Sequence, residues 1–359
     1  MVENPDIRSI SLAEIESFFR EKNEKPFRAR QVYDWIWKKT CHSFDEMTNL
    51  SIVNRQLLGS HFCFEVLKQE KELRDPDGTV KSTFRLPDQE LVESVLIPSD
   101  DRTTACISSQ AGCALACRFC ATGILGFRRN LSFTEIFDQV VLLNRQSEKY
   151  YGKPLSNIVY MGMGEPLMNY EEVMKSVEKI TSEDSLGMSP QRITVSSVGI
   201  PVMIRKMADD KARFHFALSL HAATNAKRDK IIPINKKHPL QELTEALKYY
   251  HAKTGKRFTI EYILFRDFND SLEDAKDLAV FCKSFPVKIN LIGYNPVEKT
   301  GFSQSTPEKS RAFREFLENK NMVINVRKSR GTSIDAACGQ LALADNIKQK
   351  KGKTDFPKK

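Results

Sequence analysis

The chain has 359 residues, of which 41% are hydrophobic and 28% charged, an ordinary globular composition with room for about two or three domains. The sequence shows neither an N-terminal apolar leader nor a run of about eighteen uncharged apolar residues, so we expect no signal peptide and no membrane span. A formal net charge of +9 fits a polyanionic partner such as nucleic acid, and equally a merely soluble surface.

Residues 1–60 are predicted to form a small helical domain. Ser11 and Glu14, three residues apart, have the pattern of a capping box at the start of a helix. The stretch FRARQVYDWIWKK, which begins at Phe27, mixes basic residues with an apolar helical face. Such a module is either a packed helical cap or an arm that touches RNA, and its Lys and Arg content favours the arm.

Residues 61–98 are predicted to be a β-rich linker or extension. The pair Asp77-Gly78 is a hairpin-turn signal between two stretches of alternating residues. The following segment ELVESVLIP continues the strand pattern and contains Glu93. From the residues alone, Glu93 is most simply a solvent-facing carboxylate on a strand.

Residues 99–335 alternate between strand and helix patterns and are predicted to form an α/β core with a parallel sheet, closed or partly closed as a barrel. The motifs GMGEP, SS, SLH and YNP each follow a predicted strand. Because barrel chemistry lies at the C-terminal ends of the strands, we expect these motifs to meet there. Residues 336–345 form a further loop, and the basic tail 346–359 is predicted to be disordered.

The segment GCALACRFCATG places Cys113, Cys117 and Cys120 at C-x3-C-x2-C spacing. In the reducing cytoplasm that we expect for this chain, such cysteines are metal ligands, catalytic groups or buried residues rather than disulfides. Zinc would need a fourth ligand, such as Cys106 or a histidine, and zinc sites usually pair two C-x2-C knuckles. Three thiolates can instead hold a [4Fe–4S] cluster with one iron left open, and we favour the cluster.

Two isolated cysteines have settings of their own. Cys338 lies among small residues in RGTSIDAACGQLA, which suits an accessible thiol on a loop, and Cys106 lies upstream of the cysteine loop. For both, burial as a small apolar residue is the ordinary alternative. Cys41, Cys63 and Cys282 have no comparable setting, and we expect them to be structural.

Together, the motifs CISSQAGCALACRFCATG, GMGEPLMN, SLHA, YNP and RGTSIDAACGQLA resemble the RlmN family, radical SAM methyltransferases of adenine C2 in RNA. The resemblance runs from the helical module to Cys338, nearly the whole chain. The related Cfr-type enzymes, which methylate adenine C8, typically have Ala at the position of Pro166, so Pro166 favours C2. Two departures from the family pattern are Ser197, commonly Thr, and the Thr332-Ser333 pair, which replaces a more acidic RGDD motif.

The resemblance implies a partial (β/α)6 radical SAM barrel with a small N-terminal helical domain and a short β linker. It implies that Cys113, Cys117 and Cys120 hold one [4Fe–4S] cluster, whose open iron binds S-adenosylmethionine (SAM), with two SAM molecules used per turnover. A conventional SAM methyltransferase is not favoured, because the G-x-G-x-G signature after the first strand is absent. The resemblance implies SAM contacts from Gly164, Glu165, Ser196, Ser219, Leu220, His221 and Asn295. Ser197 is the alternative to Ser196.

Adenine C2 is an electron-poor carbon that does not attack a sulfonium methyl group, so its methylation needs a radical route. The resemblance implies that Cys338 first takes a methyl group from one SAM. A radical from the second SAM then removes hydrogen from that methyl group, and the carbon adds to C2. Glu93 would accept the C2 proton, and Cys106 would attack the sulfur of Cys338, releasing the product and leaving a transient disulfide.

The resemblance implies two RNA substrates, an adenosine of the peptidyl-transferase centre in 23S rRNA and a purine next to the anticodon in tRNA. Phosphate contacts would supply most of the affinity, and the target base would be unstacked or flipped. We expect a cytoplasmic monomer that contacts no membrane and receives electrons from a donor such as flavodoxin or ferredoxin. The alternatives are an adenine-C8 methyltransferase and, in another class, an RNA-binding protein with a structural metal site.

Overall fold

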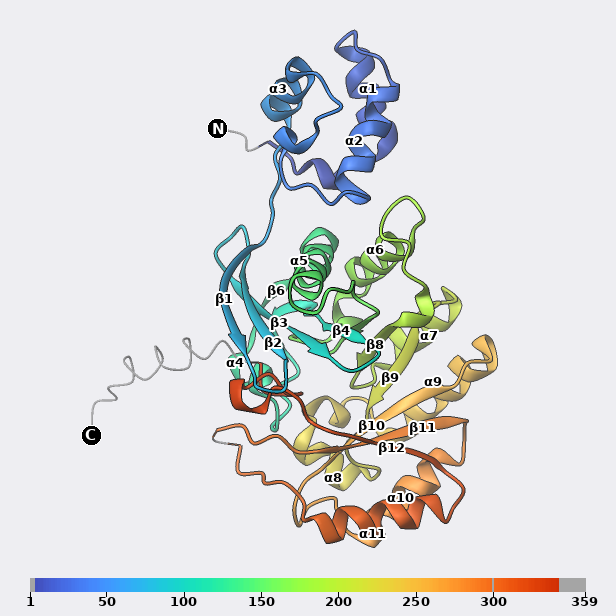
Figure 1. Cartoon of the computed structure of the whole chain (residues 1–359). Coiled ribbons are helices and arrows are strands. Elements are labelled where there is room, and N and C mark those ends of the chain that lie inside the picture. Colours follow the sequence, from blue (N-terminus) through green and yellow to red (C-terminus); the bar gives the residue numbers. More distant parts are fainter. Residues whose placement is uncertain (1–3, 299, 342–359) are drawn as a thin grey trace, which may run out of the picture.

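The computed structural model describes residues 4–298 and 300–341. The predicted tail 346–359 and the last part of the loop 336–345 therefore lie outside the described residues. Figure 1 shows a small helical module at the N-terminal end of a larger α/β body. None of the helices in the described ranges is long and apolar enough to cross a membrane.

The N-terminal module consists of three α-helices with short connections. The predicted capping box is confirmed, because Ser11 accepts from the backbone of Glu14 while the Glu14 carboxylate accepts from the backbone of Ser11. Trp37 and Ile36 are both buried, and the ring of Trp37 packs against Phe133 and Phe137 of the α/β body, so the apolar face of the module is partly used in its contact with that body. The helices are α1 (Leu12–Glu21), α2 (Phe27–Trp37) and α3 (Ile52–His61).

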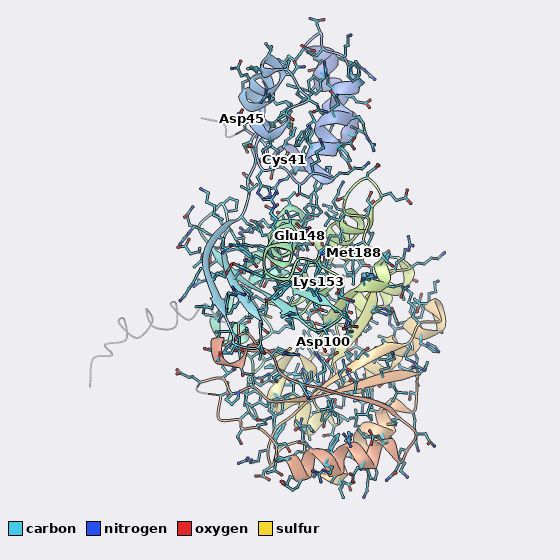
Figure 2. All side chains as sticks on the ribbon, in the orientation of Figure 1. Cys41, Asp45, Asp100, Glu148, Lys153 and Met188 are labelled. Atoms are coloured by element: carbon cyan, nitrogen blue, oxygen red, sulfur yellow. The ribbon has the colours of Figure 1, made fainter. Side chains whose placement is uncertain are left out.

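A buried ion pair fixes this module to the α/β body. Arg8 Nη1 lies 2.5 Å from Asp138 Oδ1 on helix α5 (Phe133–Tyr151), and both side chains are buried. Asp6 accepts from the same guanidinium, so the cation is matched by two carboxylates. Cys41, labelled in Figure 2 at the end of the module that faces α5, is buried in agreement with its expected structural role.

Within the described residues, ten strands form one sheet in the order β1-β2-β3-β4-β7-β8-β9-β10-β11-β12. The seven strands from β4 to β12 in this order run parallel to their neighbours. The first strands are β1 (Lys68–Arg74), β2 (Val80–Arg85), β3 (Leu91–Pro98) and β4 (Thr103–Cys106). The remaining strands are β7 (Asn157–Tyr160), β8 (Ile193–Ser197), β9 (His215–Ser219), β10 (Phe258–Leu264), β11 (Val287–Gly293) and β12 (Val323–Arg327).

Each parallel strand from β4 to β11 is followed by a helix that returns along the sheet, which confirms the predicted partial (β/α)6 barrel. The first and last strands of the sheet, β1 and β12, do not pair with each other, so the sheet stays open. The returning helices are α5, α6 (Tyr170–Thr181), α7 (Pro201–Asp209), α9 (Leu240–Thr254), α10 (Leu272–Cys282) and α11 (Pro307–Glu318), and a short α8 (Asn225–Ile231) precedes α9.

The segment 61–98 forms three antiparallel strands, β1 to β3, that continue the same sheet beyond β4. Gly78, with φ of +88°, makes the predicted hairpin turn between β1 and β2 possible. Helix α5 packs on β3, and all of the central residues of this strand are buried. The strands β1 to β3 are therefore part of the α/β core and not a separate linker.

After Cys106, the last residue of β4, the chain leaves the main sheet. The backbone N–H of Ser108 donates to the side chain of Gln139 on α5, which replaces a strand partner. A separate two-stranded sheet of β5 (Gln110–Gly112) and β6 (Phe127–Asn130) then encloses the cysteine loop and helix α4 (Ala121–Leu125). The cysteine loop is thus anchored at both ends.

Candidate active site

A cavity opens where the parallel strands end, and it contains about 1510 Å³ of space between atoms, its open mouth included. The predicted motifs meet in its wall, as expected for the C-terminal ends of parallel strands. Most of the predicted site residues line it: Cys106, Cys113, Cys117, Cys120, Gly164, Glu165, Ser196, Ser219, His221, Asn295 and Cys338. Glu93 and Leu220 are not among the lining residues.

The cysteine loop is held in shape by backbone contacts. The N–H of Cys113 donates to the carbonyl of Gly126 at 3.1 Å, and the N–H of Arg118 donates to the carbonyl of Ile231 at 3.0 Å. A Cβ atom at Gly112 would lie 1.9 Å from the carbonyl oxygen of Gly126, so only glycine fits there. Burial raises the pKa of the Cys113 thiol to about 12, which means that an isolated thiol would stay protonated.

Two glycines bring the GMGEP turn against the strand that leads to the cysteine loop. A Cβ at Gly162 would lie 2.7 Å from the carbonyl oxygen of Ile107, and one at Gly164 would lie 2.6 Å from the side chain of Gln110. The carboxylate of Glu165 is 3% exposed and accepts from the backbone N–H groups of Leu167 and Val198, each at 3.0 Å. Burial raises the pKa of Glu165, so a cationic ligand beside it would stabilise the ionised carboxylate in this buried position.

The two serines at the end of β8 have different partners. Ser196 is partly exposed and its hydroxyl donates to the carbonyl of Tyr160, whereas Ser197 is buried and accepts from the N–H of Gly199. Both line the cavity. On the next strand, Ser219 lines the cavity, while the side chain of Leu220 is completely buried in the core. Leu220 can therefore face the cavity only through its backbone.

His221 has φ of +56° and is 4% exposed. Burial lowers the pKa of His221 to about 3, so the ring is neutral at physiological pH. Its Nδ1 accepts from the N–H of Ile263 at 3.1 Å, which leaves the ring proton on Nε2. Phe119 of the cysteine loop packs edge-on against this ring, with centroids 5.0 Å apart, so His221 also supports the loop.

The loop that carries Cys338 is fastened on both sides. Before Cys338, the backbone N–H of Ser333 and its hydroxyl both donate to Asp75 Oδ2 in the β1–β2 turn, at 3.0 and 2.6 Å. After Cys338, the carbonyl of Gly339 accepts from the N–H of Ala121 at 2.7 Å, just after the cysteine loop. Figure 1 shows this red segment beside the tip of the hairpin and α4. Cys338 thus lies between two fixed contacts.

Cys106 and Cys338 face the same cavity as the cysteine loop. Burial raises the pKa of Cys106 to about 12, and a negative charge on Cys338 adds to this effect. Arg327, at the end of β12, lines the cavity and lies 3.3 Å from the carboxylate of Glu261. Its cation lowers the pKa of Cys106 and is attracted by both thiolates, so it is the electrostatic partner of the cysteine pair.

Glu93 is 3% exposed, so the solvent-facing position expected from the residues alone is wrong. It lies 3.5 Å from Lys81 Nζ, and Lys81 is also buried. The same ammonium donates to the carbonyl oxygen of Asp335, three residues before Cys338, at 3.2 Å. Glu93 is therefore connected to the Cys338 loop through Lys81.

Lys81, Arg327 and Asp75 were not predicted as site residues. Arg327 is the last residue of β12, so the strand-end argument that selected the other motifs points to it as well. Lys81 and Asp75 lie in a hairpin far from the cysteine motifs in sequence, and no local pattern distinguishes them. Only the packing of the hairpin against the Cys338 loop reveals them.

The donor set fits an iron–sulfur cluster better than a single metal ion. Among the residues that the structure describes, no three His, Cys, Asp or Glu side chains gather around one ion position. A zinc ion needs thiolates that converge on one point, whereas a [4Fe–4S] cluster binds each thiolate through a different iron. The three thiols share one cavity wall, and the space beside them suits a cluster with a second ligand.

Comparisons with known proteins agree with this geometry. The family model described as "Ribosomal RNA large subunit methyltransferase N-terminal domain" matches residues 6–64, which include the helical module. The model described as "Radical SAM superfamily" matches residues 107–279, which include the cysteine loop and most of the barrel.

The chain is 51% identical to a "Probable dual-specificity RNA methyltransferase RlmN" of Christiangramia forsetii, over 94% of this chain and 96% of that protein. It is 43% identical to a protein of the same name from Thermotoga neapolitana, over 95% and 98%. A crystal structure of a radical SAM methyltransferase from Sphaerobacter thermophilus matches with a TM-score of 0.89 and 37% identity, covering 94% of this chain and 99% of that one. The chain therefore belongs to the RlmN family of radical SAM RNA methyltransferases, which use a [4Fe–4S] cluster and SAM.

Proposed function

We propose that the chain methylates C2 of adenine in 23S rRNA, at the peptidyl-transferase centre, and in tRNA next to the anticodon. The observation that carries this proposal is the meeting of Cys106 and Cys338 in one cavity with the three-cysteine loop. A methyltransferase that uses SAM by direct displacement needs no such pair of thiols. A reaction through a methylated cysteine needs one thiol to carry the carbon and another to release it.

In this proposal, Cys113, Cys117 and Cys120 hold the cluster. When bound, the cluster supplies the electron that cleaves SAM to a 5′-deoxyadenosyl radical. Glu165 accepts from the SAM ammonium, because it is a buried carboxylate with a raised pKa at the cavity wall. Further contacts come from residues at the strand ends, namely Gly164, Ser196 or Ser197, Ser219, the backbone of Leu220, His221 and Asn295.

Cys338 holds the methyl carbon, since its loop is fixed between the hairpin and α4. After the carbon has added to adenine C2, Glu93 takes the C2 proton and the adduct radical gives up one electron, for which the bound, oxidised cluster would be the acceptor. Glu93 does not line the cavity, and its contact with Lys81, which also binds the carbonyl of Asp335, connects it to the Cys338 loop. The thiolate of Cys106 then attacks the sulfur of Cys338, an S–S bond forms, and the S–C bond breaks with its electron pair left on the carbon. That carbon takes up one proton and becomes the C2 methyl group of the product.

The helical module supports RNA as the substrate. Phe27 is 53% exposed with Arg28 stacked near its ring, and Lys39 Nζ lies 3.7 Å from the ring centroid of Trp35. Exposed aromatic rings beside basic groups suit unpaired nucleotides. We further propose that the protein acts in the cytoplasm as a monomer with flavodoxin or ferredoxin as its electron donor.

Mass spectrometry of nucleosides from rRNA and tRNA treated with the anaerobically purified enzyme tests this proposal. We expect 2-methyladenosine from both RNAs. Appearance of 8-methyladenosine instead would establish the Cfr-type reaction. The optical spectrum supplies a second criterion, because a cluster gives a brown protein, and a colourless, zinc-loaded protein with full activity would overturn the radical route.

A further inference from the structure

Arg228, on α8, is a completely buried cation that the proposed reaction does not use. Within the described residues, its four hydrogen bonds all go to neutral acceptors. Nη1 donates to Asn235 Oδ1 at 2.7 Å, Nε donates to the carbonyl of Leu220 at 3.2 Å, and Nη2 donates to the carbonyls of Val198 and Ser219. A guanidinium in such a place would ordinarily be matched by a carboxylate.

No carboxylate in the described ranges forms an ion pair with Arg228. If Cys117 is deprotonated, as it would be on binding a cluster, its thiolate attracts Arg228 more than the neighbouring Asp229 does. Burial lowers the pKa of Arg228 to about 10, so the side chain still carries its charge at neutral pH. A buried, charged and carboxylate-free arginine is costly unless another anion is present.

The surroundings of Arg228 place that anion at the cysteine loop. The next residues of α8 reach the loop directly, since the carbonyl of Ile231 accepts from the N–H of Arg118. Cys113, Cys117, Ile231 and Val198 belong to one buried apolar cluster, so the packing between α8 and the loop is mostly apolar. A charged group bound by these thiols would therefore interact with Arg228 with less screening than in water.

We propose that Arg228 is the counter-cation of the iron–sulfur cluster and raises its reduction potential. This inference rests on the proposed ligand set of Cys113, Cys117 and Cys120. Three thiolates give the bound cluster a net negative charge, and reduction by one electron makes that charge larger. A fixed cation in a dry site stabilises the reduced form more than the oxidised form, so it favours uptake of the electron.

The hydrogen bonds of Arg228 give it a second, structural effect that the test must separate. Its guanidinium joins the ends of β8 and β9, because it binds the carbonyls of Val198, Ser219 and Leu220. Loss of activity in a variant would therefore not distinguish the loss of the Arg228 charge from the loss of its hydrogen bonds to the strand ends. The reduction potential does so when a variant that keeps the charge is compared with one that removes it.

The experiment is a redox titration of the full-length, anaerobically reconstituted protein without SAM or RNA, followed by electron paramagnetic resonance. Arg228→Gln should lower the equilibrium constant for one-electron reduction of the cluster about tenfold. This corresponds to a shift of the reduction potential by about 59 mV to a more negative value. Arg228→Lys should stay near the wild-type value because it keeps the charge. Lys230→Gln, a matched charge removal at an exposed position of the same helix, should also leave the potential unchanged.

An unchanged potential in Arg228→Gln would overturn the proposal. If that variant does not hold a cluster, Arg228→Lys decides alone, since a tenfold decrease there would show that hydrogen bonding rather than charge sets the potential. Failure of the wild-type protein to take up a cluster would instead contradict the proposed ligand set. The two ideas are thereby tested separately.

Discussion

Lys81 Nζ lies 3.5 Å from Glu93 Oε1, and both side chains are buried on neighbouring strands of the β1–β3 extension. The same ammonium donates to the carbonyl oxygen of Asp335, in the loop that carries Cys338. The residue proposed to accept the proton and the loop that carries Cys338 therefore both contact the Lys81 ammonium. A change at Lys81 should affect both the stability of the fold and the step that needs Glu93.

Lys81→Met should lower the free energy of unfolding by about 3–5 kcal/mol, because Glu93 loses its buried ion-pair partner. The double variant Lys81→Met/Glu93→Gln should regain much of this loss, since the buried charge is then removed as well. Denaturant unfolding of the four proteins in this cycle measures the effect. If Lys81→Met and the double variant have equal free energies of unfolding, the Lys81–Glu93 ion pair does not contribute to stability.

The same cycle has a functional readout. If Glu93 accepts the C2 proton, Glu93→Gln should accumulate the covalent protein–RNA adduct, visible as a band of reduced mobility on a denaturing gel. Lys68→Met, at an exposed position of the same hairpin, serves as the control and should turn over normally. Normal turnover by Glu93→Gln would remove Glu93 from the mechanism.

Ser333 is one of the positions at which this chain departs from the more acidic family pattern, and its hydroxyl donates to Asp75 Oδ2 at 2.6 Å. Ser333→Asp would replace this hydrogen bond with two facing carboxylates. We expect the Cys338 loop to shift and the rate of product formation to fall about tenfold to a hundredfold, as small misplacements of reacting groups do. The melting temperature should change little, because the contact is at the surface.

Thr332→Asp supplies the matched control for this prediction. It adds the same charge at the adjacent exposed residue, which makes no side-chain hydrogen bond to Asp75 within the described part of the chain. Its rate should remain within about twofold of the wild type. An equal loss in both variants would indicate a general effect of negative charge on RNA binding.

The proposed release of product should depend steeply on pH. Burial raises the pKa of Cys106 to about 12, so only a small fraction of this thiol is ionised at neutral pH. Because the thiolate is the attacking form, the decay of a preformed protein–RNA adduct should become about tenfold faster for each pH unit between pH 7 and 9. Rapid-quench experiments measure this decay. Cys106→Ala should not release the adduct at any pH, and release by that variant would contradict the assignment.

The parts of the structure that the sequence predicted are those with local signals. The capping box at Ser11 depends on residues three positions apart, and the strand-end positions of GMGEP, SLH and YNP follow from the alternation of strands and helices. Glu93 was misjudged from its residues alone because β3 pairs with β4 of the main sheet and α5 packs on β3, which no pattern within the segment reveals. The contacts of Asp75 with Ser333 and of Lys81 with Asp335 connect distant parts of the chain. Such contacts depend on how the hairpin packs, and sequence spacing does not encode them.

Arg327 provides a further test of the cysteine pair, because its cation lowers the pKa of Cys106 and lies beside both thiols in the cavity. Arg327→Met should raise the pKa of Cys106 further, and adduct decay at a fixed pH near 7.5 should slow about threefold to tenfold. Arg327→Lys keeps the charge and should restore most of the rate. The slope of the pH dependence should be the same in all three proteins, since the thiolate remains the attacking form. If Arg327→Met and Arg327→Lys slow decay equally, the contact of Arg327 with Glu261 rather than its charge would be responsible.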